Sequence, residues 1–492
     1  MRRHPHLYEI NTWPWLKDLS RQRGRAVTLG SVPDDVWDSI ASRGFDLVYL
    51  MGIWARSDIG RQIARSDPGA WAAFDGAAAH WRIPDVVGSA FSIKGYDPDP
   101  ALGSMDDLDR ARAALHTRGM KLIVDFIPNH FGFDHPWTRT HPDRFVCGSE
   151  EAFRASPTTF RLVELDGHEP RYIARARDPY FLPWSDVAQI DYSKEDTRRA
   201  MVEQLRRIAS HADGARCDMA MLVLSDVFSN TWHMFVEPWN ATREFWEDAR
   251  AAIPEFLLIA EVYWDMEYRL QGLGFDYTYD KRLYDRLLHE NAESIAGHLQ
   301  ADPVYQSKSA RFIENHDEPR SAESFGPRVR AAACAMSTIP GLRFYYDGQF
   351  EGRKVRLPMQ LGADVEEQID NELAAFYARL LSIVDEDVFH DGSWTLCDVE
   401  RDGEAPDGLL AWRWKRGADI RLVVVNMSHG CAHGRVQLTD DLAAADRLVF
   451  EELLSGTSIE HAAADLRDGL PLRLASGEAA IFSVHAGGSL RE

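Results

Sequence analysis

The segment DGARCDMA (residues 213–220) follows a run with helical periodicity and carries an arginine two positions before a carboxylate. If this segment is a β-strand, Arg216 and Asp218 point to the same face, because side chains alternate along a strand. A guanidinium beside a carboxylate favours the ionised form and fixes its orientation. The pattern indicates a carboxylate prepared to act as a nucleophile.

Apolar segments of strand length recur on both sides of this segment and alternate with helical patterns. They are apolar throughout, which is typical of parallel strands buried on both faces. The predicted strands span residues 7–15, 45–54, 121–126, 215–219, 256–262, 275–279, 311–314 and 342–346. The clearest predicted helices span residues 32–42, 105–118, 194–211 and 371–384. Eight strands with intervening helices predict an α/β fold closed as a (β/α)8 TIM barrel.

Two regions break the alternation. Between residues 131 and 189 there is no clear period, and beyond about residue 387 the pattern changes to short strands and turns. We therefore expect a small inserted B domain after the third strand and a C-terminal antiparallel β-sandwich domain. The predicted boundaries are 1–130 and 190–386 for the two parts of the barrel, 131–189 for the inserted domain and 387–492 for the C-terminal domain.

Composition restricts the class of protein. The formal net charge of -22 argues against nucleic acid or an anionic membrane as a partner. Five scattered cysteines without a CxxC pair favour reduced thiols over a disulfide framework or a zinc site. The first residues lack the apolar core of a signal peptide, and no apolar run approaches the length of a membrane span. A cytoplasmic protein is expected.

The polar residues with the most useful chemistry fall at or just after the ends of the predicted strands. They are Asp125, His130, Arg216, Asp218, Glu261, His316 and Asp317. In a (β/α)8 barrel the C-terminal strand ends form one rim, so these side chains are expected to converge. Each alone has a plain explanation as a buried hydrogen-bonding group, but their joint occurrence favours a functional site.

Three carboxylates, two histidines and an arginine around one pocket suit glycoside hydrolysis with retention of configuration. One carboxylate attacks the anomeric carbon, and a second protonates the leaving oxygen and later activates water. Asp218 beside Arg216 suits the ionised nucleophile. Glu261 follows an apolar run, and a less polar setting raises the pKa of a carboxyl toward the range of an acid/base catalyst.

The chain resembles the α-amylase family of glycoside hydrolases (family 13), in its α-glucosidase-like branch. Four short stretches carry the resemblance in order: DFIPNH (125–130), GARCD (214–218), the glutamate of LLIAEVYW (257–264) and FIENHD (312–317). The resemblance implies that Asp218 is the nucleophile, Glu261 the acid/base and Asp317 the stabiliser of the transition state. By the same resemblance the sugar in the −1 subsite is bound by Arg216, His130 and His316, with Asp125 supporting Arg216 and Tyr96 beneath the sugar ring.

Two further residues concern specificity. In α-glucosidase-like members a GYD motif and an arginine after the seventh strand clasp the terminal glucose, and here these positions are Asp97 and Arg320. The resemblance implies an exo-acting enzyme; alternatively, an Asp97–Arg320 salt bridge only shapes the loop. Tyr263 and Trp264 either line the acceptor side or serve packing, and Tyr180, Phe181 and Trp184 are candidates for a wall of the site.

The expected substrate is a small oligosaccharide or α-glucoside. Neither a required metal nor a cofactor is predicted, because no full oxygen cage can be identified in the sequence. A transglycosylase of the glucanotransferase, sucrose phosphorylase or disaccharide isomerase type uses the same triad and is the alternative. A binding-only homologue is the third interpretation, disfavoured by the intact triad. The linkage, the leaving group and the oligomeric state are left open.

Overall fold

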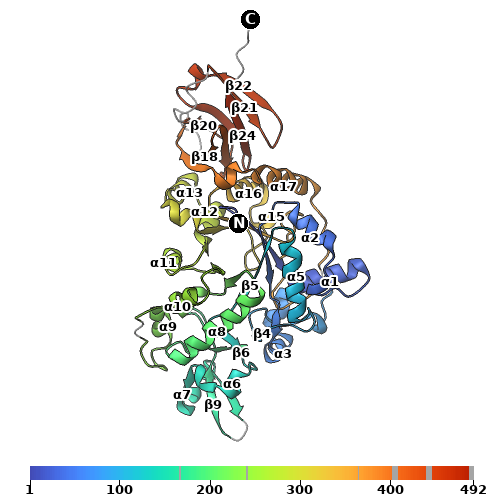
Figure 1. Cartoon of the computed structure of the whole chain (residues 1–492), viewed down its shortest axis with the longest axis vertical. Coiled ribbons are helices and arrows are strands. Elements are labelled where there is room, and N and C mark those ends of the chain that lie inside the picture. The colour runs from blue at the N-terminus through green and yellow to red at the C-terminus, as the bar shows by residue number, and fades with distance from the viewer. Residues whose placement is uncertain (166–167, 240–241, 364, 402–407, 439–445, 487–492) are drawn as a thin grey trace.

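The computed structural model describes residues 1–165, 168–239, 242–363, 365–401, 408–438 and 446–486. A barrel occupies the middle of the molecule, with small β-sheets of an inserted region at one end and a C-terminal β region at the other (Figure 1). The predicted fold class is confirmed: the barrel is closed, and antiparallel sheets follow it in the chain.

Eight parallel strands form the barrel, and neighbours in the chain are neighbours in the sheet. In chain order they are β1 (His6–Asn11), β2 (Leu47–Met51), β5 (Lys121–Phe126), β11 (Gly214–Cys217), β12 (Leu257–Ala260), β13 (Tyr277–Tyr279), β14 (Ser309–Arg311) and β15 (Leu342–Tyr346). The barrel closes where β1 pairs with β15. Nearly all of these residues are buried, as expected for strands covered by helices outside and by packed side chains inside.

Helices surround this barrel, and their ends follow local capping chemistry. The Ser104 hydroxyl accepts the Asp107 N–H while the Asp107 carboxylate accepts the Ser104 N–H, a capping box that starts α5. Asp370 accepts the Leu373 N–H and starts α17. The helices are α1 (Thr12–Arg23), α2 (Asp34–Ala41), α3 (Asp58–Ser66), α4 (Pro68–Ala77), α5 (Met105–His116), α8 (Glu195–His211), α9 (Ser225–Trp232), α10 (Phe245–Ala252), α11 (Glu267–Gly272), α12 (Lys281–His289), α13 (Ala292–Leu299), α14 (Pro303–Ser307), α15 (Ser321–Ser324), α16 (Val329–Thr338), α17 (Asn371–Val384) and α18 (Val388–Asp391). Over the described residues, no helix combines the length and apolar character that crossing a membrane requires.

Three predicted strands extend three or more residues past the ends that the structure has. The strand predicted at 7–15 stops at Asn11, and α1 begins at Thr12, with Pro14 in its first turn where proline is tolerated. The strand predicted at 45–54 stops at Met51, because Gly52 turns the chain with φ 75°. The strand predicted at 311–314 ends at Arg311.

The inserted region leaves and rejoins the barrel through an antiparallel pair, β6 (His130–Gly132) with β10 (Val187–Gln189). Beyond this neck, β7 (Cys147–Gly148), β9 (His168–Ala174) and β8 (Phe160–Leu165) form a three-stranded sheet. Two short helices, α6 (Trp137–Thr140) and α7 (Glu150–Ala155), lie in the same stretch of chain. The neck places the inserted region beside the C-terminal end of β5.

The C-terminal region contains a six-stranded sheet in the order β16-β18-β19-β24-β21-β22 and a three-stranded sheet in the order β17-β20-β23. Its strands are β16 (Ser393–Cys397), β17 (Val399–Arg401), β18 (Leu409–Arg416), β19 (Asp419–Asn426), β20 (Ala432–Val436), β21 (Arg447–Glu452), β22 (Ser458–Ala462), β23 (Leu470–Leu474) and β24 (Ala479–Ala486). A separate buried apolar cluster between these strands gives the region its own core. It packs against the barrel through α16 and α18.

Candidate active site

The motifs predicted from the sequence meet at the C-terminal ends of the barrel strands. Asp218 directly follows β11 and Glu261 directly follows β12, while Asp125 lies near the end of β5. Arg216 is in register with Asp125 on one neighbouring strand and with Ile259 on the other. Parallel strands in this register bring together side chains that are far apart in the chain.

Arg216 is the centre of the cluster. Its Nη1 lies 2.7 Å from Asp218 Oδ1, and its Nη2 lies 2.8 Å from Glu261 Oε2 and 3.7 Å from Asp317 Oδ2. The side chain of Arg216 is only 1% exposed, so these charges interact with little screening by water. One buried guanidinium therefore contacts all three carboxylates that the sequence predicted as catalytic.

Glu261 has the environment of a carboxyl that keeps its proton near neutral pH. Burial, together with the nearby Asp218 and Asp317 carboxylates, raises the pKa of Glu261 to about 7, although Arg216 opposes the rise. The Tyr263 hydroxyl donates to Glu261 Oε1 at 2.9 Å, and the Met219 N–H donates to Oε2 at 2.7 Å. Met219 adopts a left-handed conformation with φ 41°, which non-glycine residues seldom do, and this turn directs its N–H toward Glu261.

Asp317 is held in the ionised form by His316. Although burial opposes the change, the His316 imidazole lowers the pKa of Asp317 to about 2, and His316 Nε2 lies 3.0 Å from Asp317 Oδ2. His316 Nδ1 lies 2.5 Å from Glu9 Oε1. These two carboxylates raise the pKa of His316 well above its ordinary value in spite of its burial. For Asp218, burial raises the pKa and the ion pair with Arg216 opposes the rise.

Glu9 was missed in the sequence. Its only signal is an acidic residue inside an apolar strand, LYEIN, and it is fully buried beside His316. Burial raises the pKa of Asp125 and the charge of Arg216 opposes the rise, so the two residues interact, and the supporting role of Asp125 stays a prediction. Among the described residues its carboxylate accepts the Tyr49 hydroxyl at 2.5 Å and the Gly52 N–H at 2.7 Å, and it forms no direct ion pair with Arg216.

Tyr96 does not lie at the surface of the site. It is 1% exposed, its ring packs against Trp54, Phe126 and Phe131, and its hydroxyl accepts the Ile127 N–H at 3.0 Å. Phe91 contacts the cluster instead: its ring centroid lies 5.4 Å from that of His316 and 4.9 Å from the guanidinium carbon of Arg216. Tyr96 lies on β4 (Ile93–Pro98) and Phe91 just precedes this strand, and the resemblance had pointed to Tyr96.

The structure also separates Asp97 from Arg320. The side chain of Asp97 is 67% exposed and pairs with Arg207 at 2.5 Å. Arg320 is buried, pairs with Glu314 at 3.0 Å and donates to the Asp347 carbonyl at 2.8 Å. The predicted clasp between Asp97 and Arg320 is therefore not formed, and neither is the alternative salt bridge between them.

His130 lies beside the inserted region. It is 4% exposed, and its ring centroid lies 5.3 Å from that of Trp184. Burial lowers the pKa of His130 to about 4, so the imidazole is neutral at physiological pH and can both donate and accept a hydrogen bond. This suits a residue that binds sugar hydroxyls.

The oxygens near Asn129 do not fit a calcium ion. Gln189 Nε2 donates to the Asn129 carbonyl at 3.1 Å, to Asn129 Oδ1 at 2.9 Å and to the Ile190 carbonyl at 3.1 Å. An amide donor thus occupies the place where a cation would require only oxygen ligands. Within the described ranges no group of three or more His, Cys, Asp or Glu residues is arranged to hold a metal.

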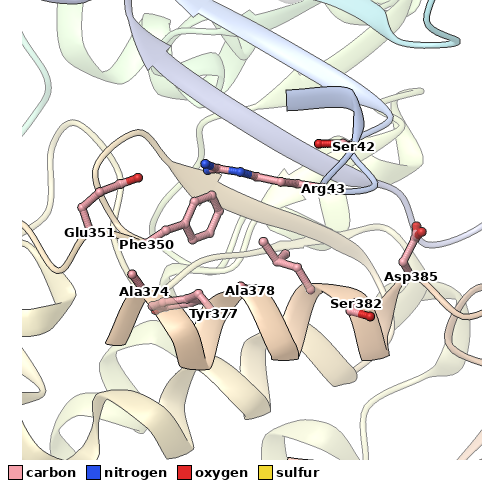
Figure 2. A pocket seen from close by; sticks show the side chains of 10 residues that line it. Ser42, Arg43, Phe350, Glu351, Ala374, Tyr377, Ala378, Ser382 and Asp385 are labelled. Carbon is pink, nitrogen blue, oxygen red and sulfur yellow. The ribbon is translucent and has the colours of Figure 1, made fainter. Parts of the chain in front are cut away.

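A pocket of about 380 Å³ lies away from this cluster (Figure 2). It is lined by Ser42 and Arg43 after α2, by Phe350 and Glu351 after β15, and by one face of α17. Arg43 extends over the Phe350 ring, with its guanidinium carbon 5.4 Å from the ring centroid. None of the residues predicted for catalysis lines this pocket.

Comparisons with known proteins show what the chain is similar to. The family described as "Alpha amylase, catalytic domain" matches residues 91–371, which is more than half of the chain. Alpha-amylase 3 of Dictyoglomus thermophilum is 24% identical over 300 residues, which cover 55% of this chain and 56% of that protein. An alpha-glucosidase of Apis mellifera is 40% identical over 312 residues, which cover 54% of this chain and 53% of that protein. The chain thus spans about half the length of these curated relatives.

A solved structure shares the overall architecture. The maltogenic alpha-amylase AmyB of Thermotoga neapolitana superposes with a TM-score of 0.69 at 18% identity, covering 99% of both chains. At this identity the likeness concerns the fold.

Proposed function

Since this chain belongs to the α-amylase family of glycoside hydrolases, we propose that it is a retaining glycosidase that cleaves short α-glucosides through a covalent glycosyl-enzyme intermediate. The observation that carries the proposal is the arginine-centred cluster. One buried guanidinium lies 2.7, 2.8 and 3.7 Å from the carboxylates of Asp218, Glu261 and Asp317. Such a cluster stabilises positive charge that develops at an anomeric carbon.

In the first step Asp218 attacks the anomeric carbon while Glu261 donates its proton to the leaving oxygen. The bond from carbon to the leaving oxygen breaks as the ester to Asp218 forms. A pKa of about 7 keeps Glu261 protonated in slightly acidic solution, and Arg216 favours the ionised form of Asp218. The two carboxyls interact strongly, so their protons titrate as a coupled pair.

In the second step Glu261, now ionised, accepts a proton from water as the water attacks the same carbon, and Asp218 leaves. Asp317, Arg216, His316 and His130 hold the hydroxyls of the sugar. Phe91, which packs on Arg216 and His316, takes the place beneath the ring that the sequence suggested for Tyr96. Two inversions at one carbon leave the product with the configuration of the substrate.

The mode of attack on longer chains is a separate question. The predicted exo action depended on a clasp between Asp97 and Arg320, and these residues have other partners. We therefore propose a retaining α-glucoside hydrolase without assigning attack to the chain end or to the interior.

Time-resolved proton NMR tests this function with a panel of α-linked disaccharides, α-glucosyl fluoride and maltoheptaose, each with and without phosphate. Early release of α-glucose, before mutarotation, is the expected result, and Asp218→Asn is the inactive control. Initial β-glucose would contradict retention. New linkages or glucose phosphate without net hydrolysis would assign the chain to the transglycosylases. The products of maltoheptaose decide between exo and endo action.

A further inference from the structure

Three consecutive large apolar residues are exposed on the inserted region. Tyr180, Phe181 and Leu182 are 70%, 73% and 86% exposed, and they lie between β9 and β10. Their loop is nevertheless held in place, because Asp178 Oδ1 accepts the N–H groups of Tyr180 at 2.6 Å and Phe181 at 2.9 Å. Large apolar side chains that are exposed close together and held in place are candidates for contact with a ligand or a partner.

This surface is continuous with the acid/base side of the candidate site. The Tyr180 ring centroid lies 5.0 Å from that of Trp264 in an edge-to-face arrangement. Trp264 follows Tyr263, whose hydroxyl donates to Glu261 at 2.9 Å. At the other end of the same loop Trp184 packs on His130. We call Tyr180, Phe181, Leu182 and Trp264 the aromatic rim.

The turn that contains Trp264 has an unusual backbone conformation and is held by an ion pair. Trp264 and Asp265 have φ values of 66° and 60°, a left-handed conformation that non-glycine residues rarely adopt. Arg282 holds this turn by donating to both carboxylate oxygens of Asp265, at 2.8 and 2.7 Å. Strained backbone that the surrounding structure maintains is common at functional sites.

The position of the aromatic rim determines which part of a substrate it meets. The acid/base protonates the leaving oxygen, so groups beyond Glu261 face the leaving group rather than the sugar that is transferred to Asp218. The chemistry offered there is mainly apolar. Among the described residues, the carboxylates of Asp178 and Asp265, which adjoin the aromatic rim in the chain, are engaged, Asp178 by backbone N–H groups and Asp265 by Arg282.

We propose that the leaving group of the preferred substrate is apolar, so that the enzyme acts on alkyl or aryl α-glucosides, with the aglycone packed on the aromatic rim. This inference rests on the proposed function. The reaction is balanced as a hydrolysis: the bond from the anomeric carbon to the aglycone oxygen breaks, that oxygen takes the proton of Glu261, and water supplies the oxygen and protons of the released sugar and of the regenerated acid.

A series of alkyl α-glucosides tests the inference on the full chain. Methyl, butyl and octyl α-glucoside share the chemistry of the leaving oxygen and differ only in apolar length. Because burying each methylene is favourable, kcat/KM is expected to rise by about tenfold or more from methyl to octyl. Octyl glucoside is used below its micelle concentration, and maltose serves as the substrate with a sugar leaving group.

Substitutions in the aromatic rim test whether it is the surface that binds the aglycone. In Tyr180→Ala and in Trp264→Ala the ratio of kcat/KM for octyl over methyl α-glucoside is expected to fall toward one. The ratio is internal to each variant, so partial loss of folded protein does not alter it. Tyr172→Ala is the matched control, because Tyr172 lies on β9 of the same inserted region and packs on Phe153 at 5.1 Å instead of on Trp264. It should keep the ratio of the unchanged protein.

The outcomes separate the two proposals. If α-glucosyl fluoride, which has no aglycone, is turned over but the alkyl series is flat or maltose is the better substrate, the apolar leaving group is wrong and the proposed function stands. If α-glucosyl fluoride is not turned over, both fail. A flat series together with self-association of the chain that Tyr180→Ala abolishes would make the aromatic rim a contact between protein copies and also overturn the inference.

Discussion

The barrel buries imidazole and guanidinium groups at both of its ends. The pKa of His316 at one end is raised, whereas the pKa values of His4 and His390 at the other end are lowered. At the C-terminal ends of the strands lies the catalytic cluster of Arg216, His316 and three carboxylates. At the N-terminal ends lies what we call the basal cluster. It consists of His4, His6, His390 and Arg343.

The basal cluster contains the same residue types, but in the part of the chain that the structure describes no carboxylate pairs with its imidazole rings, and the nearby Asp46 accepts the backbone N–H of His6 at 2.8 Å. Over the described residues Arg343 is engaged by an imidazole and a carbonyl, His6 Nε2 at 3.1 Å and the Phe389 oxygen at 2.6 Å. Burial, assisted by Arg343, lowers the pKa of His4 to about 2 and that of His390 to about 3. The pKa of His316 is raised instead, because two carboxylates lie against it.

The difference shows that burial beside a guanidinium keeps an imidazole neutral, and that carboxylate partners reverse the effect. The carboxylate-rich end can hold and transfer protons, whereas the basal cluster packs on Trp414 of the C-terminal region and serves structure. Substitutions in the catalytic cluster should change catalysis, and substitutions in the basal cluster should change stability.

The largest effect is expected for the nucleophile. Asp218→Asn keeps the size of the side chain but removes its charge, and kcat/KM should fall by about 10⁴-fold or more. The measurement is release of glucose from the best substrate of the NMR panel. His390→Gln, in the basal cluster, is the control and should retain kcat/KM. Residual activity above a tenth of the unchanged protein would exclude Asp218 as the nucleophile.

The second effect concerns the acid/base. Glu261 must be protonated for the first step, so kcat/KM should decline as the pH rises through about 7. Glu261→Gln should lower kcat/KM by about 10³-fold and remove this decline, because the amide does not titrate. The check is a pH profile from pH 4 to 9 for both proteins. A decline that persists in the variant would place the titrating group elsewhere.

The third effect concerns stability in acid. His390 has a lower pKa in the folded chain than in the unfolded chain, so below pH 6.5 the unfolded state binds the extra proton and stability is lost as the pH falls. This histidine alone should lower the free energy of unfolding by about 2 kcal/mol between pH 7 and pH 5. His390→Gln keeps a donor for the His4 carbonyl and should lose less stability over the same interval.

Urea unfolding at pH 7 and pH 5 measures this difference, and other titrating groups cancel when the two proteins are compared. Equal losses in both would mean that His390 accepts a proton in the folded state.

The smallest effect is expected at Asp97. Its side chain is largely exposed and pairs with Arg207, so Asp97→Ala should change kcat/KM by about twofold at most and the free energy of unfolding by about 1 kcal/mol or less. The products of maltoheptaose provide the most sensitive readout, with Arg207→Ala as the matched variant. A shift of cleavage away from chain ends in Asp97→Ala alone would restore the role that the sequence suggested.

Strong local patterns predicted individual elements well. The strands at residues 121–126 and 342–346 and the helix at 371–384 were predicted with the bounds that the structure has. Long apolar runs and a regular helical face leave one conformation that buries them. The prediction at 7–15 was wrong, because apolar residues continue from a strand into a helix and hydrophobicity alone does not mark the change at Asn11.

The residues of the candidate site show the same difference between what local patterns predict and what they miss. The residues Asp218, Glu261 and Asp317 could be proposed as one cluster because each comes at or after the end of a predicted strand, and strand order relates position in the chain to position on the rim. In the structure Asp218 and Glu261 directly follow β11 and β12, and Asp317 lies in the loop after β14. Glu9 could not be assigned, since its contact with His316 exists only because β1 closes the barrel beside β15. Asp97 was assigned to the candidate site from its motif, but in the structure its side chain pairs with Arg207.

The amino-acid pattern determined the barrel, its two additions and the chemical character of the rim, because burial of apolar faces and alternation along strands are local properties. Only the tertiary structure decided that Phe91 rather than Tyr96 faces Arg216, and that Tyr180 meets Trp264 across two segments of chain. Both choices depend on packing in the folded chain. The partners that decide them, Arg216 for Phe91 and Trp264 for Tyr180, come from distant parts of the sequence.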